Sequence, residues 1–525
     1  MAVIKKKDNI EPRSLSANAA NSDVLPENTI DALSSRQSRE LIIGFCGAVG
    51  SGIKSLVGIT GERLESLGYT KIIHIRVSDI MQKIFHEWED NPLDISTPYL
   101  RYKNLQDFGN SLRKSYYKHI LAEAVISEIS IEKKLLESDI DYNQQTSRVA
   151  FLIDQLKHPA EIELLRIVYQ HNFYLIGVIR SENERKRNLR DEDISKSEID
   201  EIIHRDRKGL ESYEQQTAKA ILDADYFIKN NQGQKTHLEY KIKRVINLIH
   251  GVNGITPTLN EKGLYAAFSA SLQSACLSRQ VGAAILDDLG NLLATGKNDV
   301  PKFGGGLYTA DDGINDHRCV FKGGKCYNDF RKKGIKEKIE RILSSDEVSE
   351  KKIILDKDQI KFLADKLIRD TPISSIIEYS RSIHAEMDAI TSMARLSGKS
   401  TLNTVLYTTT YPCHNCARHI VASGIKKVVY IEPYEKSLAL DLHDDAITEI
   451  NEKEKVIFDG FEGVSPRRYQ KFFFPTDERK NNDGIANKTN AKYGNHIDMQ
   501  FLDSYLDFEK RISDIFTDRV KKPEP

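Results

Sequence analysis

His384-Ala385-Glu386 is followed, 26 residues after Glu386, by Pro412-Cys413-His414-Asn415-Cys416, and these two motifs predict the architecture of the second half of the chain. An imidazole and two thiolates are ligands that zinc favours, and three protein ligands leave a fourth tetrahedral position open for water. We therefore predict that His384, Cys413 and Cys416 bind zinc (Zn2+) in a site of the catalytic kind. Glu386 need not contact the metal and can carry protons.

The residues around this pattern predict two helices whose N-termini meet on a sheet. The run after His384 contains good helix formers with apolar residues at helical spacing. Pro412 suits a helix start, and Cys413 and Cys416, three residues apart, are expected on one face of that helix. A helix N-terminus also stabilises thiolates electrostatically. Residues 405–409 predict the strand that precedes the second helix.

The two motifs, in this order, resemble the H-x-E and P-C-x-x-C signature of zinc deaminases that act on cytosine and adenine. A noncatalytic copy or a structural zinc site is the alternative. Residues 278–298 predict two apolar strands around a turn at Asp288-Leu289-Gly290. This stretch resembles the deoxycytidylate deaminase branch of the cytidine deaminase superfamily. The resemblance implies that Asn298 binds the sugar and that Ala385 lies in the substrate pocket; a turn asparagine is the alternative for Asn298.

An insertion at about residues 301–372 separates this hairpin from His384. It contains His317, Cys319 and Cys326, and then becomes charged and helical. A second, structural zinc site is one interpretation of these three residues, because some deoxycytidylate deaminases carry one. Isolated side chains in a loop that covers the substrate are the preferred interpretation, because the spacing is loose.

The first half of the chain contains a pattern typical of a phosphate-binding loop. Residues 41–46 predict a buried strand, which runs into Gly47-Ala48-Val49-Gly50-Ser51-Gly52-Ile53-Lys54-Ser55. Such glycines let backbone N–H groups wrap a phosphate at a helix N-terminus. We predict nucleotide binding by Gly47, Gly50, Ser51, Gly52, Lys54 and Ser55. Ile53 stands where the pattern G-x-x-x-x-G-K-[ST] requires Lys, which puts phosphoryl transfer in doubt.

Three further segments resemble the P-loop kinases. Residues 149–154 predict a strand that ends in Asp154, the layout that holds Mg2+ beside a nucleotide. Arg180, Arg185, Arg187 and Arg190 resemble the lid of nucleoside monophosphate kinases, although a solvated helix face is the simpler interpretation of that cluster alone. Residues 224–230 resemble the last strand of those kinases. The predicted fold class is α/β: a P-loop kinase-like parallel sheet domain followed by a cytidine-deaminase-fold α/β/α domain.

Length and composition indicate what kind of protein this is and where it is located. The chain has 525 residues, 29% of them charged, a net charge of −1 and six cysteines. This balance gives no overall basic signal for nucleic acid, and no apolar run reaches the length of a membrane span. Six cysteines in so long a chain argue against a disulfide framework, and the first residues lack a signal peptide. We therefore predict a cytoplasmic protein without a membrane segment.

The composition also predicts the domain boundaries. We expect a flexible tail at 1–38, the P-loop kinase-like domain at 39–232, a linker helix at 233–258, the deaminase domain at 259–475 and a surface extension at 476–525.

The two domains in this order resemble the bacterial anti-phage cytidine deaminases. The resemblance implies conversion of dCTP and dCMP to dUTP and dUMP, which depletes the dCTP pool during infection. It also implies regulation through the N-terminal domain, an inhibitory small RNA in some members, and a homo-oligomer. Two other functions stay open: a bifunctional deoxynucleotide kinase and deaminase, and a polynucleotide cytidine deaminase acting on tRNA or single-stranded DNA.

Overall fold

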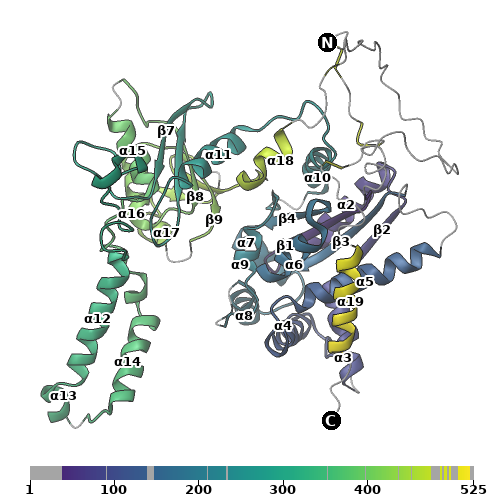
Figure 1. Cartoon of the computed structure of the whole chain (residues 1–525), viewed down its shortest axis with the longest axis horizontal. Helices are drawn as coiled ribbons and strands as arrows, with labels where there is room; N and C mark the ends of the chain where they lie inside the picture. The colour runs from purple at the N-terminus through teal and green to yellow at the C-terminus, as the bar shows by residue number, and fades with distance from the viewer. Residues whose placement is uncertain are drawn as a thin grey trace, which may run out of the picture.

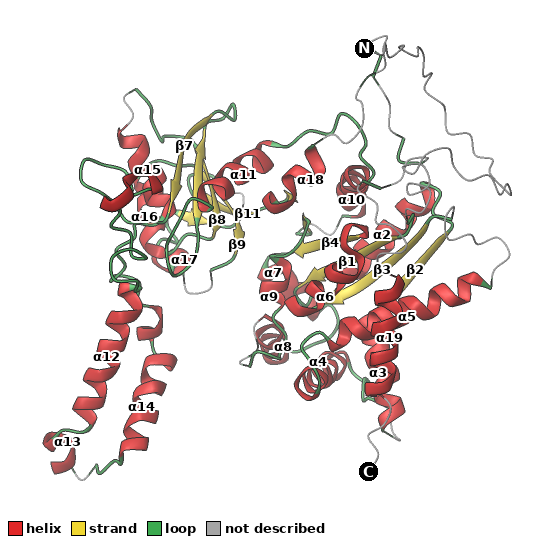
Figure 2. Cartoon of the chain, viewed as in Figure 1, coloured by secondary structure: helices red, strands yellow, loops and turns green. Residues whose placement is uncertain are grey.

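The structure, a computed structural model, describes most of the chain between residues 38 and 520. The described residues are 38–89, 92–138, 147–207, 209, 211–231, 234–351, 353–395, 398–434, 437–450, 452–474, 480, 485–486, 490–492, 496–497 and 506–520. The predicted tail therefore lies outside the described residues, except for Ser38. Two lobes are visible, each built on a sheet with helices around it (Figures 1 and 2).

The first lobe is a twisted parallel sheet covered by helices. Its strands are β1 (Leu41–Gly47), β2 (Lys71–Arg76), β3 (Val149–Leu156), β4 (Phe173–Ile179) and β5 (Tyr226–Lys229), in the order β5-β4-β1-β3-β2. Alternate residues of β1 enter two different apolar clusters, Ile42 on one face and Leu41 and Ile43 on the other. Burial on both faces is typical of a parallel strand and explains its continuous apolar sequence.

Ten helices of this lobe surround the sheet in the described part of the chain. They are α2 (Ile53–Ser66), α3 (Val77–Trp88), α4 (Pro98–Ser115), α5 (Ile120–Glu137), α6 (Pro159–Tyr169), α7 (Glu182–Arg190), α8 (Lys196–Arg207), α9 (Thr217–Ile221), α10 (Lys235–Ile249) and α19 (Leu506–Val520). The residues predicted as a linker helix form α10, whose Leu238, Ile242 and Ile246 are buried in the core of the lobe. The linker helix is thus an integral part of the first domain.

The C-terminal segment also belongs to the first lobe. Although a surface extension is predicted there, α19 lies along α5 (Figure 1), and Glu509 forms an ion pair of 2.7 Å with the buried Lys133. Leu506, Ile512 and Phe516 pack against the apolar core. The prediction was wrong for these residues because an amphipathic helix hides its apolar face only when a distant partner is present.

The second lobe is a mixed sheet between two layers of helices. Its strands are β6 (Gly282–Leu286), β7 (Leu292–Lys297), β8 (Val405–Thr410), β9 (Lys427–Glu432), β10 (Ile447–Thr448) and β11 (Val456–Gly460), in the order β10-β11-β9-β8-β6-β7. The predicted hairpin is confirmed: β6 and β7 are antiparallel, and the Asp287 carboxylate accepts hydrogen bonds from the N–H groups of Leu289 and Asn291.

The helices of the second lobe include a long projecting pair. They are α11 (Leu259–Ser271), α12 (Tyr327–Leu343), α13 (Asp346–Glu350), α14 (Lys357–Asp370), α15 (Ala385–Arg395), α16 (His414–Ala422) and α17 (Ala439–Leu442). Helix α18 (Tyr469–Phe473) lies between the lobes and buries Phe472 in the core of the first lobe. The predicted insertion forms α12 to α14, an arm that extends away from the sheet (Figure 1). No helix in the described residues combines the length and apolar character needed to cross a membrane.

A glycine on β7 positions the helix that begins beside His384. A Cβ atom on Gly296 would lie 2.2 Å from the Ala385 carbonyl oxygen and 2.4 Å from the Ala389 nitrogen. The absence of a side chain therefore allows α15 to pack directly on the strand. Helix α11 covers the opposite face of the sheet, where it contacts β6 and β8.

The two lobes are joined by a strand exchange. Strand β12 (Gly463–Val464) follows β11 of the second sheet but pairs antiparallel with β5 of the first. Beside it, Glu462 accepts hydrogen bonds from the Lys229 N–H at 2.8 Å and from Lys241 Nζ at 2.6 Å. Lys229 also contacts Asp459 of β11. Residues 463–464 fall within the predicted deaminase domain, 259–475, whereas their backbone completes the first sheet.

Candidate active site

The two motifs of the second lobe meet where strands end and helices begin. His384 immediately precedes α15, and β8 ends at Thr410, just before Cys413. Cys413 is the N-cap of α16, and Cys416 lies in its first turn. The prediction that both cysteines lie within the helix was wrong by one residue, because Cys413 has extended backbone geometry. The predicted pair of adjacent helix N-termini is present, and α15 contacts α16.

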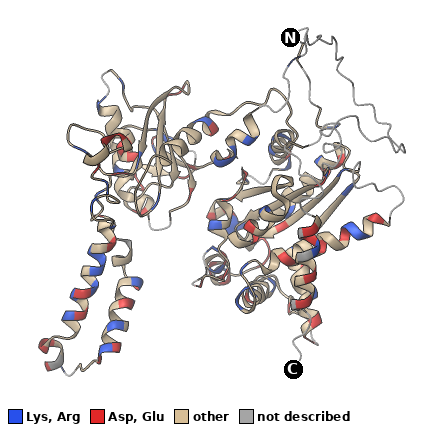
Figure 3. Ribbon diagram, in the orientation of Figure 1, with Lys and Arg blue, Asp and Glu red and all other residues tan. Residues whose placement is uncertain are grey.

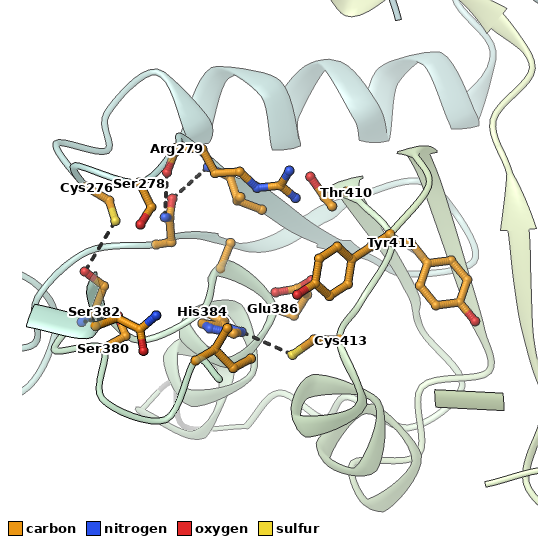
Figure 4. Close-up of a pocket in the computed structure, with 16 residues that line it drawn as sticks. Cys276, Ser278, Arg279, Ser380, Ser382, His384, Glu386, Thr410, Tyr411 and Cys413 are labelled. Atoms are coloured by element: carbon orange, nitrogen blue, oxygen red, sulfur yellow. Dashed lines mark hydrogen bonds between the residues drawn. The ribbon is translucent and has the colours of Figure 1, made fainter. Parts of the chain in front are cut away.

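His384, Cys413 and Cys416 form a compact set of metal-ligand atoms. The His384 Nδ1 atom is 3.3 Å from the Sγ atom of each cysteine, and the three atoms lie within 4.8 Å of one another. Both cysteines are buried. Figure 4 shows the side chains of His384 and Cys413 pointing toward each other at the floor of a pocket. A nitrogen and two sulfurs at this separation fit Zn2+ with one coordination position open.

The electrostatics of these side chains favour a thiolate. The pKa of Cys413 is lowered because the Cys416 thiol and the His384 imidazole both hydrogen-bond to its sulfur. The pKa of His384 is raised, chiefly by the same hydrogen bond to Cys413. A thiolate is the form in which cysteine binds a metal.

Glu386 lies against the metal ligands without joining them. One carboxylate oxygen, Oε2, is 3.4 Å from Cys416 Sγ, and the other, Oε1, is 3.5 Å from the Thr408 hydroxyl. The side chain is only 4% exposed, and burial raises the pKa of its carboxyl group. A buried carboxyl group with a raised pKa is suited to exchange protons near neutral pH.

A cavity with a volume of about 180 Å³ opens above these residues. This volume is below the roughly 300–1,000 Å³ of pockets that enclose a whole drug-sized ligand, so the cavity holds part of a larger molecule. Side chains from the loop before β6, the residue after β7, the end of β8 and the insertion surround it, together with residues that flank α15 and follow β9 (Figure 4). The lining residues are Cys276, Ser278, Arg279, Val281, Asn298, Asn328, Ile377, Ser380, Ser382, His384, Ala385, Glu386, Thr410, Tyr411, Cys413 and Tyr434.

The two residues predicted to bind substrate both line this cavity. Ala385 is fully buried at the start of α15. Asn298 directly follows β7, and its carboxamide already has two partners: Oδ1 accepts from the Val281 N–H at 2.7 Å, and Nδ2 donates to the Arg279 carbonyl at 2.8 Å. Asn298 therefore fixes the backbone that carries Arg279, and its role toward a sugar stays a prediction.

The insertion supplies pocket residues that sequence reasoning missed. Asn328, in the first turn of α12, is 8% exposed and donates a hydrogen bond of 2.9 Å to the Ile376 carbonyl. Its Oδ1 atom is buried without a hydrogen-bond partner in the described part of the chain. No local pattern marks Asn328, because it lies 56 residues before His384 and reaches the pocket only through the base of the arm.

A second metal cluster is not formed by the described residues. Among them, His384, Cys413 and Cys416 are the only group of three or more ligands close enough to share an ion. Cys319 instead lies 3.8 Å from Arg381 Nη1, and Cys326 lies 3.7 Å from the Ser278 hydroxyl. The structure therefore favours separate side chains over a zinc site at His317, Cys319 and Cys326.

In the first lobe, the predicted phosphate-loop residues form a strand, a loop and a helix. Gly47 ends β1, and α2 begins at Ile53 with Gly52 as its N-cap. Gly50 and Gly52 have φ values of 79° and 80°, which a side chain would disfavour. Gly50, Ser51, Gly52, Lys54 and Ser55 line one cavity together with Asp154 of β3. The structure thus brings the loop and the predicted acidic residue together, and nucleotide binding by them stays a prediction.

The arginine cluster is not a solvated helix face throughout. Arg185 of α7 is 8% exposed, and its Nη1 atom lies 3.5 Å from the Val49 carbonyl of the loop. Arg180 contacts Glu184 at 3.5 Å. The simpler interpretation of the cluster was therefore wrong for Arg185, because α7 folds back onto the loop.

Comparison with known proteins supports a deaminase domain in the second lobe. Residues 258–432 match the family described as "Cytidine and deoxycytidylate deaminase zinc-binding region". The matched range contains the hairpin, the insertion and both metal motifs. Together with the cluster of His384, Cys413 and Cys416, this match identifies Zn2+ as the cofactor of the site.

Individual relatives share a short part of the chain. The deoxycytidylate deaminases of Enterobacteria phages T2 and T4 are each 49% identical over 55 residues, 10% of this chain and 29% and 28% of theirs. ComE operon protein 2 of Bacillus subtilis is 43% identical over 56 residues, 11% of this chain and 29% of that protein. The chain thus spans less than a third of the length of the curated relatives that it matches.

Among solved structures, the dCMP deaminase of cyanophage S-TIM5 in its apo form is similar, with 19% identity and a TM-score of 0.22. The alignment covers 39% of this chain and all of that chain.

Proposed function

We propose that the protein is a zinc-dependent deaminase that hydrolyses the 4-amino group of deoxycytidine nucleotides. The observation that carries the proposal is the buried Glu386 carboxylate, 3.4 Å from Cys416 Sγ and beside the three side chains that would hold zinc at the floor of a cavity. The reaction consumes one water molecule and releases one ammonia molecule.

Each residue has a defined part in this reaction. When bound, zinc lowers the pKa of a coordinated water and so supplies a nucleophile near neutral pH. The Glu386 carboxylate would accept a proton from the water and deliver it to the ring nitrogen N3. It would then accept the second proton of that water, from the new hydroxyl group on C4, and deliver it to the leaving amino group, so that ammonia and a C4 carbonyl result. Thr408 hydrogen-bonds to the carboxylate and holds it in place. The cavity walls exclude bulk water from the ring.

Nucleotides of deoxycytidine are the proposed substrates, either dCMP or dCTP. Support comes from the family match and from relatives named deoxycytidylate deaminases. Arg279 lines the cavity and is 43% exposed at its side chain, where it also contacts Glu432 at 2.9 Å. A cation at the mouth of the cavity suits a substrate whose phosphates remain outside.

The test is deamination by the purified, zinc-loaded protein of dCMP, dCTP, deoxycytidine, CTP and a cytosine oligodeoxynucleotide. We expect uracil products from dCMP or dCTP and none from the oligonucleotide. Glu386→Gln should lower turnover by about 10²–10⁴-fold while the zinc content stays unchanged. Full turnover in this variant would contradict the assigned role of Glu386, and turnover of the oligonucleotide alone would support the polynucleotide deaminase instead.

The charge distribution disfavours that polynucleotide alternative. The net charge of the chain is −1, and Figure 3 shows basic and acidic residues interspersed on the helices of both lobes. Binding to single-stranded nucleic acid uses a basic groove with aromatic stacking platforms. Free nucleotides need neither feature.

We also propose that the first lobe regulates the deaminase. The support is the continuous connection between the lobes: β12 pairs with β5, and Lys229 of β5 contacts Asp459 of β11. Activity measured with and without added nucleoside triphosphates and RNA tests this idea, and no response to any of them would contradict it. Phosphate transfer from ATP to dCMP would instead reveal the bifunctional enzyme.

Antiviral defence by depletion of the dCTP pool in the cytoplasm, with a homo-oligomeric enzyme and an inhibitory small RNA, completes the proposal. Its support is the two-domain resemblance. Plating of phage on cells that express the wild type or Glu386→Gln tests the defence, and equal plating on both would contradict it. Sedimentation of the purified protein, with and without associated RNA, tests the assembly.

A further inference from the structure

The cavity beside the glycine-rich loop of the first lobe carries more than the sequence predicted for it. It has a volume of about 660 Å³ and lies between the loop after β1, helices α3 and α4, and the end of β3. A volume of this size falls within the range of small-molecule sites. Its wall also contains Arg76, Arg101 and Tyr102, which are far from the loop in the sequence.

The loop lacks its usual lysine, but another lysine reaches it. Ile53 is 5% exposed and packs in an apolar cluster. Lys157 follows β3 directly, and its Nζ atom lies 2.8 Å from the Gly47 carbonyl, the first carbonyl of the loop. Lys157 is 7% exposed and lines the cavity. The buried Lys157 ammonium group therefore contacts the glycine-rich loop, although Lys157 follows β3 and not β1.

A buried carboxylate, that of Asp206, contacts both Lys157 and the loop. Asp206 of α8 is fully buried, and its Oδ1 atom lies 2.8 Å from Lys157 Nζ. Its Oδ2 atom accepts a hydrogen bond of 2.8 Å from the Val49 N–H, a backbone donor of the loop. Asp206 thus contacts the two kinds of group, an ammonium and a loop N–H, that bind phosphate in such loops.

Four polar side-chain atoms in the cavity wall lack partners. In the described part of the chain, Ser51 Oγ, Asp154 Oδ1, Gln106 Oε1 and Gln215 Oε1 are buried and make no hydrogen bond. These residues are 1%, 6%, 4% and 7% exposed, and all four line the cavity. Buried polar atoms are almost always paired in native proteins. Ser51 Oγ can donate or accept a hydrogen bond, whereas the other three atoms are acceptors that need donors such as the hydroxyl and amino groups of a nucleoside. The glycine-rich loop at the N-terminus of α2 favours an anion, such as the phosphate of that nucleoside.

We propose that this cavity binds a nucleoside phosphate, with Lys157 as the phosphate-binding cation and Asp206 as an internal carboxylate that competes with the phosphate. Lys54 stands where a phosphate loop has the Ser or Thr that holds Mg2+. The site is therefore built to bind a nucleotide without transferring its phosphate. The inference does not rest on the deaminase activity, because it concerns binding to the other lobe.

The test is calorimetric titration of the full-length, zinc-loaded protein with ATP, GTP, dTTP and inorganic tripolyphosphate, each with Mg2+. None of these probes contains cytosine, the base proposed for the deaminase pocket, and the variants below separate binding in the first lobe from binding at that pocket. We expect at least one nucleotide to bind at one site per chain. The variant Lys157→Met, combined with Asp206→Asn so that no charge is left unpaired, should weaken binding by about tenfold or more.

Two single variants sharpen the test. Asp206→Asn alone should tighten binding, because it leaves the Lys157 ammonium in need of an anion. Lys235→Met, which removes an exposed lysine of α10 outside the cavity, should leave binding unchanged. The melting temperature of each variant shows that it is folded.

The proposal is overturned if none of the four probes binds to the wild type. It is also overturned if Lys54→Met abolishes binding while the double variant retains it, or if Asp206→Asn weakens binding in a folded protein.

Discussion

The two lobes each place a loop between a buried strand and a helix N-terminus, but the polar side chains around that loop come from different parts of the chain. In the second lobe, Cys413 and Cys416 come from the loop and helix after β8, and His384 comes from the residue just before the neighbouring helix α15. In the first lobe, the loop after β1 carries Ile53 at the usual lysine position, and Lys157 arrives from 110 residues after Gly47. A buried ammonium group can thus reach this loop from a residue that follows another strand.

The largest expected effect comes from removing a zinc ligand, which tests whether the two sites are independent. Cys416→Ser should abolish zinc binding and deamination, because the hydroxyl is a poor substitute for a thiolate. The first lobe should remain folded. Its state can be followed separately, since Trp88 of α3 is the only tryptophan in the chain. A changed Trp88 emission in this variant would show that the lobes fold as one unit.

Two buried histidines, His250 and His496, should make the stability of the first lobe depend on pH. Burial lowers the pKa of His250 to about 4 and that of His496 to about 3. Both therefore stay neutral in the folded first lobe but become protonated in the unfolded chain below its pKa of about 6.5. The contribution of each histidine to the free energy of unfolding is therefore complete above pH 6.5 and is lost as the pH falls toward 4. Between pH 7 and pH 5 we expect a loss of about 2 kcal/mol for each histidine.

Urea unfolding followed by Trp88 fluorescence measures this loss. The control is the double variant His250→Asn and His496→Asn, whose stability should depend less on pH over the same range. The same steep dependence in the double variant would assign the acid sensitivity to other groups.

A smaller effect is expected from crowding the contact between α15 and β7. Gly296→Ala places a methyl group 2.2 Å from the Ala385 carbonyl, which should cost about 1–3 kcal/mol. Because His384 adjoins Ala385, zinc affinity should fall as well. Competition with a chelator and thermal unfolding measure both effects. Gly334→Ala is the matched control, since a Cβ atom there meets nothing within 4 Å. Unchanged zinc affinity in Gly296→Ala would mean that the helix shifts without moving His384.

The smallest expected effect tests whether the arm contributes to the substrate pocket. Asn328→Ala removes the unpaired Oδ1 atom and should raise KM for the deoxycytidine nucleotide by about tenfold, with kcat little changed. Lys338→Ala, farther along α12, should alter neither constant. An unchanged KM in Asn328→Ala would limit the arm to a structural role.

Much of this protein was predictable because its decisive motifs are short and local. The pattern of His384, Glu386, Cys413 and Cys416 predicted the metal site, and the structure places the three ligands together. The apolar runs of 41–46 and 405–409 predicted β1 and β8, because a buried strand needs only its own apolar residues to be recognised.

Tertiary structure alone decided the features that depend on contacts between distant residues. The exchange of β12 into the first sheet, the packing of α19 on α5, and the approach of Lys157 and Asp206 to the loop each join segments far apart in the chain. Asn328 enters the pocket in the same way. Sequence patterns report the face that a segment buries and the chemistry that adjacent residues share, whereas the partner that a buried face or a buried charge finds is determined only when the whole chain has folded.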